Sequence, residues 1–318
     1  MTLTSGELAP ALALGLDADK LQEFCARVSR AVTEGPLPSV QVALARYGEL
    51  ALFCSFGAAA NQNRYNTYSC IKPVVAAAIW KLMGEGAIDI TQAVSAYIPQ
   101  FADNGKAAVT VEQVLCHTAG FPEAPMGAPD WWTAEGRLQR MRSWYLNWEP
   151  GSRMVYHATS AHWVLAALIE TITGRDYRDY LREDILEPLG LHDLRLGVPQ
   201  AEQGNILPLA HVGEPPSADE LQALFGRAVD WPNTVDDTLL LFNQPRVREL
   251  GVPGGGGIAT AADMAMFYQA LLANPGQLWD PAVLADAIGR VRVDFPDPMT
   301  NVAANRGLGV VIAGEGPG

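Results

Sequence analysis

The sequence predicts an α+β fold, and three observations support this. Segments rich in β-forming residues lie near both ends of the 318-residue chain, a long series of helical patterns lies between them, and the two kinds of segment do not alternate. Regular alternation would instead indicate a parallel sheet built from βαβ units. We find no internal repeat and no linker, so we expect a single domain.

The first predicted elements are a helix and a β-hairpin. Over residues 19–33, apolar side chains recur at helical spacing on one face. Residues 40–57 form two β-rich arms around a Tyr47-Gly48-Glu49 turn, in which Gly48 can take a positive φ. The predicted helical face consists of Leu21, Phe24, Cys25, Val28 and Val32.

The middle of the chain predicts a series of helices. One begins near Ser69 and ends at the glycines of residues 84–86, since Pro73 is tolerated in a first helical turn but not in a helix interior. A capping box of Thr110 with Gln113 begins a shorter helix.

Three further segments follow in the sequence. Residues 159–173 predict a buried helix closed by Gly174, and residues 175–187 predict an amphipathic helix stopped by Pro188. Residues 197–235 are rich in proline, glycine and acidic residues, so we expect a long excursion there.

The C-terminal part predicts a glycine turn, a helix and a strand. Residues 254–257 are four glycines that lead into a helix capped by Thr260 with Asp263. They could suggest a phosphate loop, but no Gly-Lys-Ser/Thr follows, and a tight turn explains them. Residues 307–315 (GLGVVIAGE) predict a strand.

The charge of the chain disfavours some classes of partner. It has 35 acidic and 22 basic residues, a formal net charge of −13. Such a surface repels phosphate backbones and anionic lipid, so we expect neither a nucleic-acid nor a membrane partner. No run approaches the roughly 20 apolar residues that a membrane span needs. The oligomeric state stays open.

The N-terminus and the cysteines indicate a cytoplasmic protein. The first 20 residues show no basic region before their apolar part, so they predict no secretory signal. The cysteines are widely spaced and form no C-x-x-C pair, which favours reduced thiols. An exported protein lacking its leader would look the same. The cysteines are Cys25, Cys54, Cys70 and Cys116.

Ser69 and Lys72 form the most informative pair in the sequence. A serine hydroxyl needs a base within hydrogen-bond reach to act as a nucleophile. Residues three apart on a helix share a face, so the lysine amine can point back at the serine oxygen. A desolvated lysine can act as that base. The helix N-terminus beside Ser69 can help to stabilise an oxyanion.

The pair alone does not decide the function. Chance places about one S-x-x-K in a chain of this length, and a lysine after one helical turn is usually solvated. Two readings therefore stay open from the pair itself: a nucleophile with its base, or two surface neighbours.

Five segments resemble, in order, those of the serine β-lactamase and penicillin-binding-protein superfamily. They are closest to its class C β-lactamase-like branch, which includes family VIII carboxylesterases, D-amino-acid peptidases and acyltransferases. No single segment is specific for this superfamily, but five segments in the same order over roughly residues 20–312 are. The segments are YSCIKPVVAAAIWKLMGEGAIDI (68–90), VTVEQVLCHTAGF (109–121), PGSRMVYHATSAHWVLAALIETITGRDY (150–177), LREDILEPLGLHDLRLG (181–197) and VPGGGGIATAADMAMFYQAL (252–271).

The resemblance implies a β-lactamase-like fold. An antiparallel sheet built from both ends of the chain would carry helices on its faces. A mostly helical lobe over about residues 60–190 would be inserted between the sheet segments, within a single catalytic domain over residues 1–318. The site would lie between sheet and lobe, with Ser69 at its base.

Carried over residue by residue, the resemblance implies that Ser69 is the acyl-accepting nucleophile and Lys72 its base. Tyr156 would be the tyrosine of the second motif. A phenol near a lysine ammonium loses its proton more easily, so Tyr156 could pass protons between Ser69 and the leaving group. Taken alone, Tyr156 is more often a half-buried aromatic at a helix start.

The second motif departs from the family pattern. The family usually has an asparagine two residues after the tyrosine, and this chain has Ala158 there. This puts β-lactam and peptide recognition in doubt more than simple ester cleavage. His157 could substitute as a substrate-binding residue, although an exposed loop histidine is the alternative.

The third motif of the family is not found. It is Lys-Thr-Gly, or a His-x-Gly or Trp-x-Gly equivalent, and would follow the strand of residues 307–315. The chain stops at Gly318 before it. His211-Val212-Gly213 has the right letters but precedes the glycine segment. We therefore expect a C-terminally incomplete chain, with an exposed sheet edge and weak activity if the strand is truly absent.

Other candidate residues have structural explanations. His117 matches a structural position of the family. No G-x-S-x-G elbow occurs, so the α/β-hydrolase route is not supported. No metal-ligand constellation emerges, and we expect neither a metal nor a cofactor.

The sequence therefore favours a serine hydrolase that acts through an acyl-enzyme on Ser69. Its substrate would be a small-molecule ester or amide, most simply a small ester. The alternative within this chemistry is a β-lactamase, D-Ala-D-Ala carboxypeptidase or D-aminopeptidase, which would need export. An alternative of another class is a catalytically silent binding protein on the same fold.

Overall fold

The computed structural model describes residues 3–214, 216–226, 228 and 238–313. Helices and antiparallel strand pairs both occur in it, which confirms the α+β prediction. Its helices are α1 (Ser5–Ala13), α2 (Ala18–Thr33), α3 (Lys72–Gly84), α4 (Val94–Tyr97), α5 (Val111–Leu115), α6 (Ala134–Ser143), α7 (Ser160–Thr173), α8 (Tyr177–Leu181), α9 (Ala218–Phe225), α11 (Pro245–Leu250), α12 (Ala261–Ala273) and α13 (Pro281–Gly289). Its strands are β1 (Ser39–Arg46), β2 (Glu49–Gly57), β3 (Tyr65–Tyr68), β4 (Arg195–Leu196) and β5 (Gly257–Ala259).

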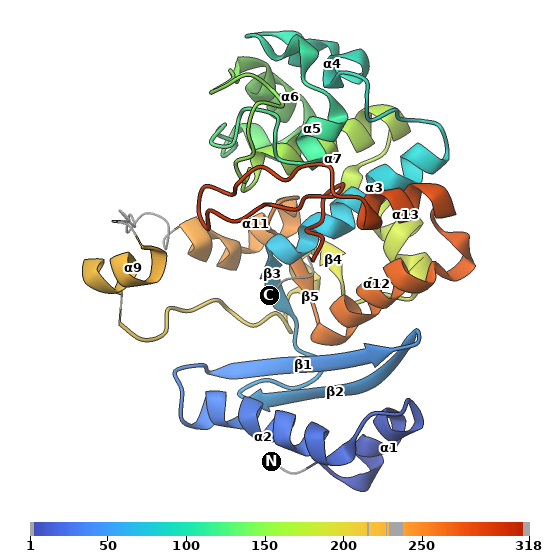
Figure 1. The fold of residues 1–318 in the computed structure, drawn as a ribbon, viewed down its shortest axis with the longest axis vertical. Coiled ribbons are helices and arrows are strands. Elements are labelled where there is room, and N and C mark those ends of the chain that lie inside the picture. The colour runs from blue at the N-terminus through green and yellow to red at the C-terminus, as the bar shows by residue number, and fades with distance from the viewer. Residues whose placement is uncertain (1–2, 215, 227, 229–237, 314–318) are drawn as a thin grey trace.

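The predicted β-hairpin is confirmed. Strands β1 and β2 pair antiparallel, and Tyr47 and Gly48 between them have φ of 54° and 81°. Two consecutive positive φ values suit a two-residue turn that follows the twist of the strands. Helices α1 and α2 pack on the side of the hairpin away from the rest of the molecule, and α12 packs on the side that faces it (Figure 1).

The N-terminal helices differ in part from the expectation. Helix α2 matches the predicted helix, but Phe24 on its predicted apolar face is exposed. Helix α1 was not predicted. Its signal was a capping box, since the Thr4 side chain accepts the Glu7 N–H and the Glu7 side chain accepts the Thr4 N–H.

A second, three-stranded sheet lies beside the start of α3. Its strand order is β3-β5-β4, with Tyr65 opposite Ala259 and Arg195 opposite Ile258. The sheet therefore joins the segment before Ser69 to the glycine segment 254–257, although these are far apart in the sequence.

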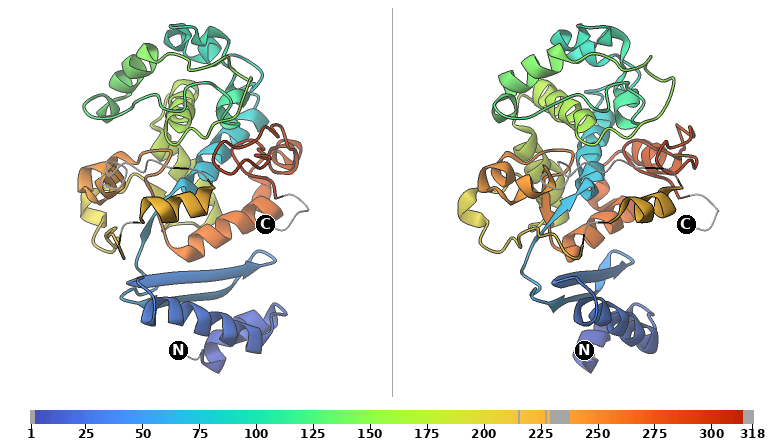
Figure 2. Two further views of the ribbon diagram at one scale, coloured as in Figure 1. Left: turned by 60° about the vertical axis from the view of Figure 1, so that its left-hand side comes forward. Right: turned by 90° about the vertical axis from the view of Figure 1, so that its left-hand side faces the viewer.

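The main core forms around α3 and α7, which pack against each other in the middle of the molecule (Figures 1 and 2). Both helices are apolar on nearly every face, as expected of helices with no exposed side. Helix α7 ends at Gly174 in the left-handed conformation, as predicted. Among the described residues, no helix is both long and apolar enough to cross a bilayer.

The predicted C-terminal strand is wrong for residues 307–313, which form turns and isolated bridges; residues 314 and 315 lie outside the described part. Gly309 has a φ of 83°, and a Cβ there would lie 2.4 Å from the Cβ of Ala76 on α3. The Trp80 indole donates to the Leu308 carbonyl at 3.0 Å. This segment therefore packs against α3. The expectation that one sheet combines strands from both ends of the chain is not met by the hairpin sheet, since in the described residues both of its strands come from the N-terminal end.

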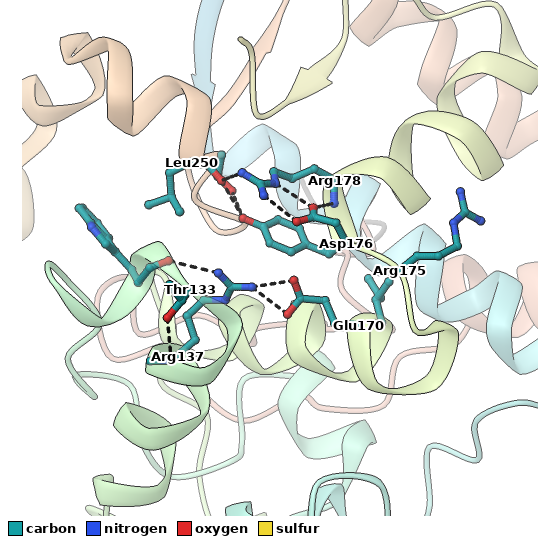
Figure 3. A network of polar contacts seen from close by, with 12 residues as sticks. Thr133, Arg137, Glu170, Arg175, Asp176, Arg178 and Leu250 are labelled. Atoms are coloured by element: carbon teal, nitrogen blue, oxygen red, sulfur yellow. Dashed lines mark hydrogen bonds and ion pairs between the residues drawn. The ribbon is translucent and has the colours of Figure 1, made fainter. Parts of the chain in front are cut away.

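Polar contacts join α6 to α7, and α8 to the end of α11 (Figure 3). Arg137 donates two hydrogen bonds, of 2.6 and 2.8 Å, to the Glu170 carboxylate. Burial raises the pKa of Glu170, although the positive charge of Arg137 acts to lower it. The Tyr177 hydroxyl lies 2.8 Å from the Leu250 carbonyl oxygen. The contact of Tyr177 holds the end of α11, just before the glycine segment 254–257, against α8.

The predicted excursion at residues 197–235 lies partly outside the described residues. Within it, α9 begins at a capping box of Ser217 with Glu220. The prediction that the whole chain is one domain with an inserted helical lobe stays a prediction.

Candidate active site

Ser69 lies where β3 meets α3. Strand β3 ends at Tyr68, whose φ of 45° and ψ of −128° turn the chain, and the Asn66 side chain accepts the Tyr68 N–H at 3.0 Å. A 3-10 turn over Ser69–Ile71 then leads into α3. A positive φ is costly for a bulky residue, and such strain collects at functional sites. The turn leaves Ser69 exposed, so a substrate can reach its hydroxyl.

Lys72, the first residue of α3, is buried with 4% of its surface exposed. Its Nζ lies 3.1 Å from the Ser69 Oγ and donates to the Ala158 carbonyl at 2.7 Å and to the Gly254 carbonyl. A neutral amine can give two N–H groups to those carbonyls and turn its lone pair toward the Ser69 hydroxyl. The structure thus brings the sequence-predicted pair into contact in a geometry that suits proton transfer.

The surroundings of Lys72 favour its neutral form. Burial, followed by the positive charge of Arg306, lowers the pKa of Lys72 to about 7. No ion pair of Lys72 with a carboxylate occurs among the residues of the described ranges. At neutral pH a large fraction of Lys72 is therefore an amine that can accept a proton.

Tyr156 completes the contact around Ser69. Its hydroxyl donates to the Ser69 Oγ at 2.7 Å, and its ring centroid lies 4.9 Å from the Lys72 Nζ. We expected Lys72 to ease deprotonation of the phenol, but burial dominates and raises the pKa of Tyr156. Tyr156 is therefore a hydroxyl donor at neutral pH, and Lys72 is the group poised to be the base.

His157 does not reach the candidate pocket. The alternative of an exposed loop histidine is wrong, since the ring is completely buried. Its Nε2 accepts the Phe121 N–H at 3.1 Å, and its Nδ1 lies 2.6 Å from the Val155 carbonyl. Burial lowers the pKa of His157 to about 4. Because both ring nitrogens contact backbone groups, His157 has no ring nitrogen left for a substrate.

His117 and His162 form a buried layer behind Tyr156. The His117 ring lies 4.9 Å from the Tyr156 ring, and its Nδ1 accepts the His157 N–H at 3.1 Å. His162 is completely buried, and neither ring nitrogen has a hydrogen-bond partner among the described residues. Burial lowers both pKa values, so these rings stay neutral and add no charge beside Lys72.

The glycine segment 254–257 lies very close to the backbone of Ala158 and to the side chain of Thr67. A Cβ at Gly254 would lie 2.8 Å from the Ala158 carbonyl oxygen, and one at Gly257 would lie 2.6 Å from the Thr67 Oγ1. Only glycine allows such contacts. The close approach places the Gly254 carbonyl beside the Lys72 amine, a contact that no sequence pattern predicts. Thr260 caps α12 as predicted.

Ala158 contributes its backbone, since its carbonyl accepts from Lys72. The residue also lines a separate apolar hollow of about 380 Å³, together with Phe242 and Trp163. His211-Val212-Gly213 is exposed and lines neither hollow.

The candidate pocket has a volume of about 380 Å³ and opens over Ser69. Arg306 is the residue that sequence reasoning missed, although it directly precedes the predicted strand. Among the residues that the structure describes, no group of three metal-ligating side chains occurs. The lining residues are Ser69, Cys70, Lys72, Pro73, His117, Tyr156, Tyr268, Arg306, Gly309, Val310 and Val311.

Comparison with known proteins identifies the family. The sequence pattern described as Beta-lactamase matches residues 24–318. This chain belongs to that family. It is 28% identical to the esterase/beta-lactamase LipL of Mycobacterium tuberculosis over 66% of this chain and 51% of LipL. It is 28% identical to the esterase EstB of Burkholderia gladioli over 91% of this chain and 79% of EstB.

A solved structure shares the fold. A family VIII carboxylesterase superposes with a TM-score of 0.74 at 21% identity, covering 99% of this chain and 84% of the other. This likeness shows the β-lactamase-like fold that the sequence implied. The chain spans about half the length of LipL and about four-fifths of EstB.

Proposed function

We propose that this chain is a serine hydrolase that acts through an acyl-enzyme on Ser69, with small esters as substrates. One observation carries the proposal: Lys72 is buried, has no carboxylate partner within the described part of the chain, and contacts two backbone carbonyls and the Ser69 hydroxyl. Membership of the Beta-lactamase family and the esterase names of LipL and EstB support it.

The first half-reaction follows from these contacts. Neutral Lys72 takes the proton of the Ser69 hydroxyl as the Oγ attacks the ester carbonyl. In this proposal the backbone N–H of Ser69, at the start of the 3-10 turn that leads into α3, donates to the oxyanion. Tyr156 passes a proton to the leaving alcohol and is replenished from the Lys72 ammonium. The C–O bond then breaks and leaves the acyl group on Ser69.

The second half-reaction repeats the proton transfers with water. Lys72, again neutral, accepts a proton from water through the Tyr156 hydroxyl while the water oxygen attacks the acyl carbon. The bond to Ser69 breaks, the carboxylic acid leaves, and Ser69 recovers its proton. Each group ends in its starting state, so one set of residues serves both steps.

β-Lactams, D-Ala-D-Ala peptides and D-amino-acid amides are the second class of candidate substrate. The family name and the name of LipL favour β-lactams. Against this stands Ala158, which has no side-chain amide to offer and lines the separate apolar hollow. We therefore place small esters first.

Hydrolysis of p-nitrophenyl acetate by the purified chain tests the proposal. The matched variants are Ser69→Ala and Ser152→Ala, because Ser152 is an exposed serine outside the pocket. We expect turnover by the wild type and Ser152→Ala, and background rates with Ser69→Ala. Background rates in all three would overturn the enzyme proposal and favour a silent binding protein.

A further inference from the structure

Arg306 brings an uncompensated positive charge into the candidate pocket. Its guanidinium carbon lies 5.6 Å from the centroid of the Tyr156 ring, and it lines the pocket with Ser69. Among the described residues it has no ion pair, and its buried Nε has no hydrogen-bond partner. Asp297 raises the pKa of Arg306 from beyond ion-pair distance, but burial outweighs it.

The neighbouring Arg292 shows what an arginine in this segment does when its role is structural. It lies 2.5 Å from a Glu112 carboxylate oxygen and also pairs with Asp286. Buried guanidinium groups normally find such partners, because an uncompensated buried charge is costly. Arg306 is half-buried, has no such partner among the described residues, and lines the candidate pocket, where a ligand can reach it.

The backbone around Arg306 is held in place, so its charge has a defined position. Its N–H donates to the Val293 carbonyl at 2.9 Å. Two residues on, Leu308 is completely buried, donates to Ala287 at 3.1 Å and accepts from the Trp80 indole. These bonds anchor the segment to α13 and, through Trp80, to α3, the helix that carries Lys72.

We propose that Arg306 binds a carboxylate of the substrate, so that the preferred substrates are esters with a carboxylate a few atoms from the scissile carbonyl. This inference rests on the proposed function. Among the described residues none that lines the pocket is acidic, so none of them competes there with a substrate carboxylate for Arg306. A planar guanidinium that stays charged at neutral pH pairs with a carboxylate through two N–H groups, and such charge-assisted bonds are the strong ones.

The carboxylate could be on either side of the ester, and paired substrates distinguish the two cases. Mono-p-nitrophenyl succinate beside p-nitrophenyl butyrate places it on the acyl side. 4-Acetoxybenzoate beside phenyl acetate places it on the leaving group. Within each pair the esters differ only by the carboxylate. Because the carboxylate also changes the intrinsic reactivity of the ester, the rate of each ester without enzyme is measured and subtracted.

Binding is measured by calorimetry in a Ser69→Ala background, where no turnover is needed. We expect one acidic ester to bind about 10- to 100-fold more tightly than its neutral partner. Arg306→Gln should abolish that preference and Arg306→Lys should keep part of it. Arg153→Gln, at an exposed arginine outside the pocket, should keep all of it. Equal binding within both pairs, or a preference that survives Arg306→Gln, would overturn the inference.

Kinetics with Ser69 intact separate this inference from the proposed function. We expect the ratio of kcat/KM between the acidic and neutral ester to fall about 10- to 100-fold in Arg306→Gln. The ratio removes any effect of Arg306 on Lys72 that both substrates share. A preference in binding without turnover of any ester would refute the hydrolase and keep the carboxylate site. Turnover with an unchanged ratio would refute the carboxylate site and keep the hydrolase.

Discussion

Lys106 and Lys72 are both buried and both contact backbone carbonyls, but only Lys72 is a candidate base. Lys106 is completely buried, and its Nζ contacts the carbonyl oxygens of Asp103 at 2.5 Å, of Arg142 at 3.3 Å and of Trp144. Lys72 has two carbonyls and the Ser69 hydroxyl instead. Burial lowers the pKa of both, but Asp103 opposes this at Lys106, whereas Arg306 adds to it at Lys72.

The comparison shows that burial and backbone acceptors alone do not make a base. Three carbonyls match the three N–H groups of an ammonium, so Lys106 can stay charged and pin the loop after α4 to the end of α6. At Lys72 the third partner carries a proton of its own, and the positive charge of Arg306 adds to the effect of burial on the pKa. A hydroxyl in place of a carbonyl thus turns a structural lysine into a candidate catalytic one.

Lys72→Met should have the largest effect on activity, because it removes the proposed base and keeps most of the apolar stem. We expect kcat/KM for p-nitrophenyl acetate to fall by about 10³-fold. Circular dichroism would check that the fold is kept. Activity within a few-fold of wild type in a folded variant would show that another group is the base.

Tyr156→Phe should have the next largest effect. It deletes the hydroxyl 2.7 Å from the Ser69 Oγ and keeps the ring. We expect about a 10²-fold loss, mostly in kcat, because the proton path to the leaving group is lost. Stopped-flow kinetics with esters of increasingly poor leaving groups would measure it. A loss that does not grow as the leaving group becomes poorer would contradict the proton-transfer role.

The dependence of kcat/KM on pH should follow the protonation state of Lys72. Lys72 must be neutral to accept the proton, so kcat/KM should fall about tenfold per pH unit below its pKa of about 7 and level off above it. With a neutral ester, Arg306→Gln should move this limb to higher pH, because removing a positive charge favours the ammonium. A limb that stays in place would mean that another group controls it.

Lys106→Met should have the smallest effect on activity. Its carbonyl partners lose their donor, so we expect the free energy of unfolding to fall by about 1–3 kcal/mol. The rate per folded molecule should change by less than about twofold, since the Lys106 side chain does not line the pocket. Urea unfolding and active-site titration would measure the two effects. A rate loss like that of Lys72→Met would remove the distinction between the lysines.

The elements that the sequence predicted well carry local signals. The hairpin has its Tyr47-Gly48 turn, α7 ends at a left-handed glycine, and the Thr110 capping box begins α5. The contact of Ser69 with Lys72 is also local, because one helical turn joins them. Such features depend on neighbours in the sequence, which pattern reasoning can see.

The parts that were missed depend on distant segments. The two carbonyls that contact Lys72 belong to Ala158 and Gly254, which are 86 and 182 positions further along the chain. Every residue has a backbone carbonyl, so the residue types there do not predict these contacts. The strand over residues 307–315 was expected from its β-forming residues. In the structure, Gly309 and the Trp80–Leu308 hydrogen bond fasten the segment to α3 instead, which also brings Arg306 into the pocket.

The most direct test of the account is to trap the acyl-enzyme and locate the acyl group. The chain would be mixed with p-nitrophenyl acetate, quenched in acid within the first turnover and digested for peptide mass spectrometry. We predict one acetyl group on Ser69, resolved by fragmentation from the adjacent Cys70, and none in Ser69→Ala. Acetyl on Cys70 or on Lys72 in place of Ser69, or no acetylated peptide while ester is still hydrolysed, would contradict the account.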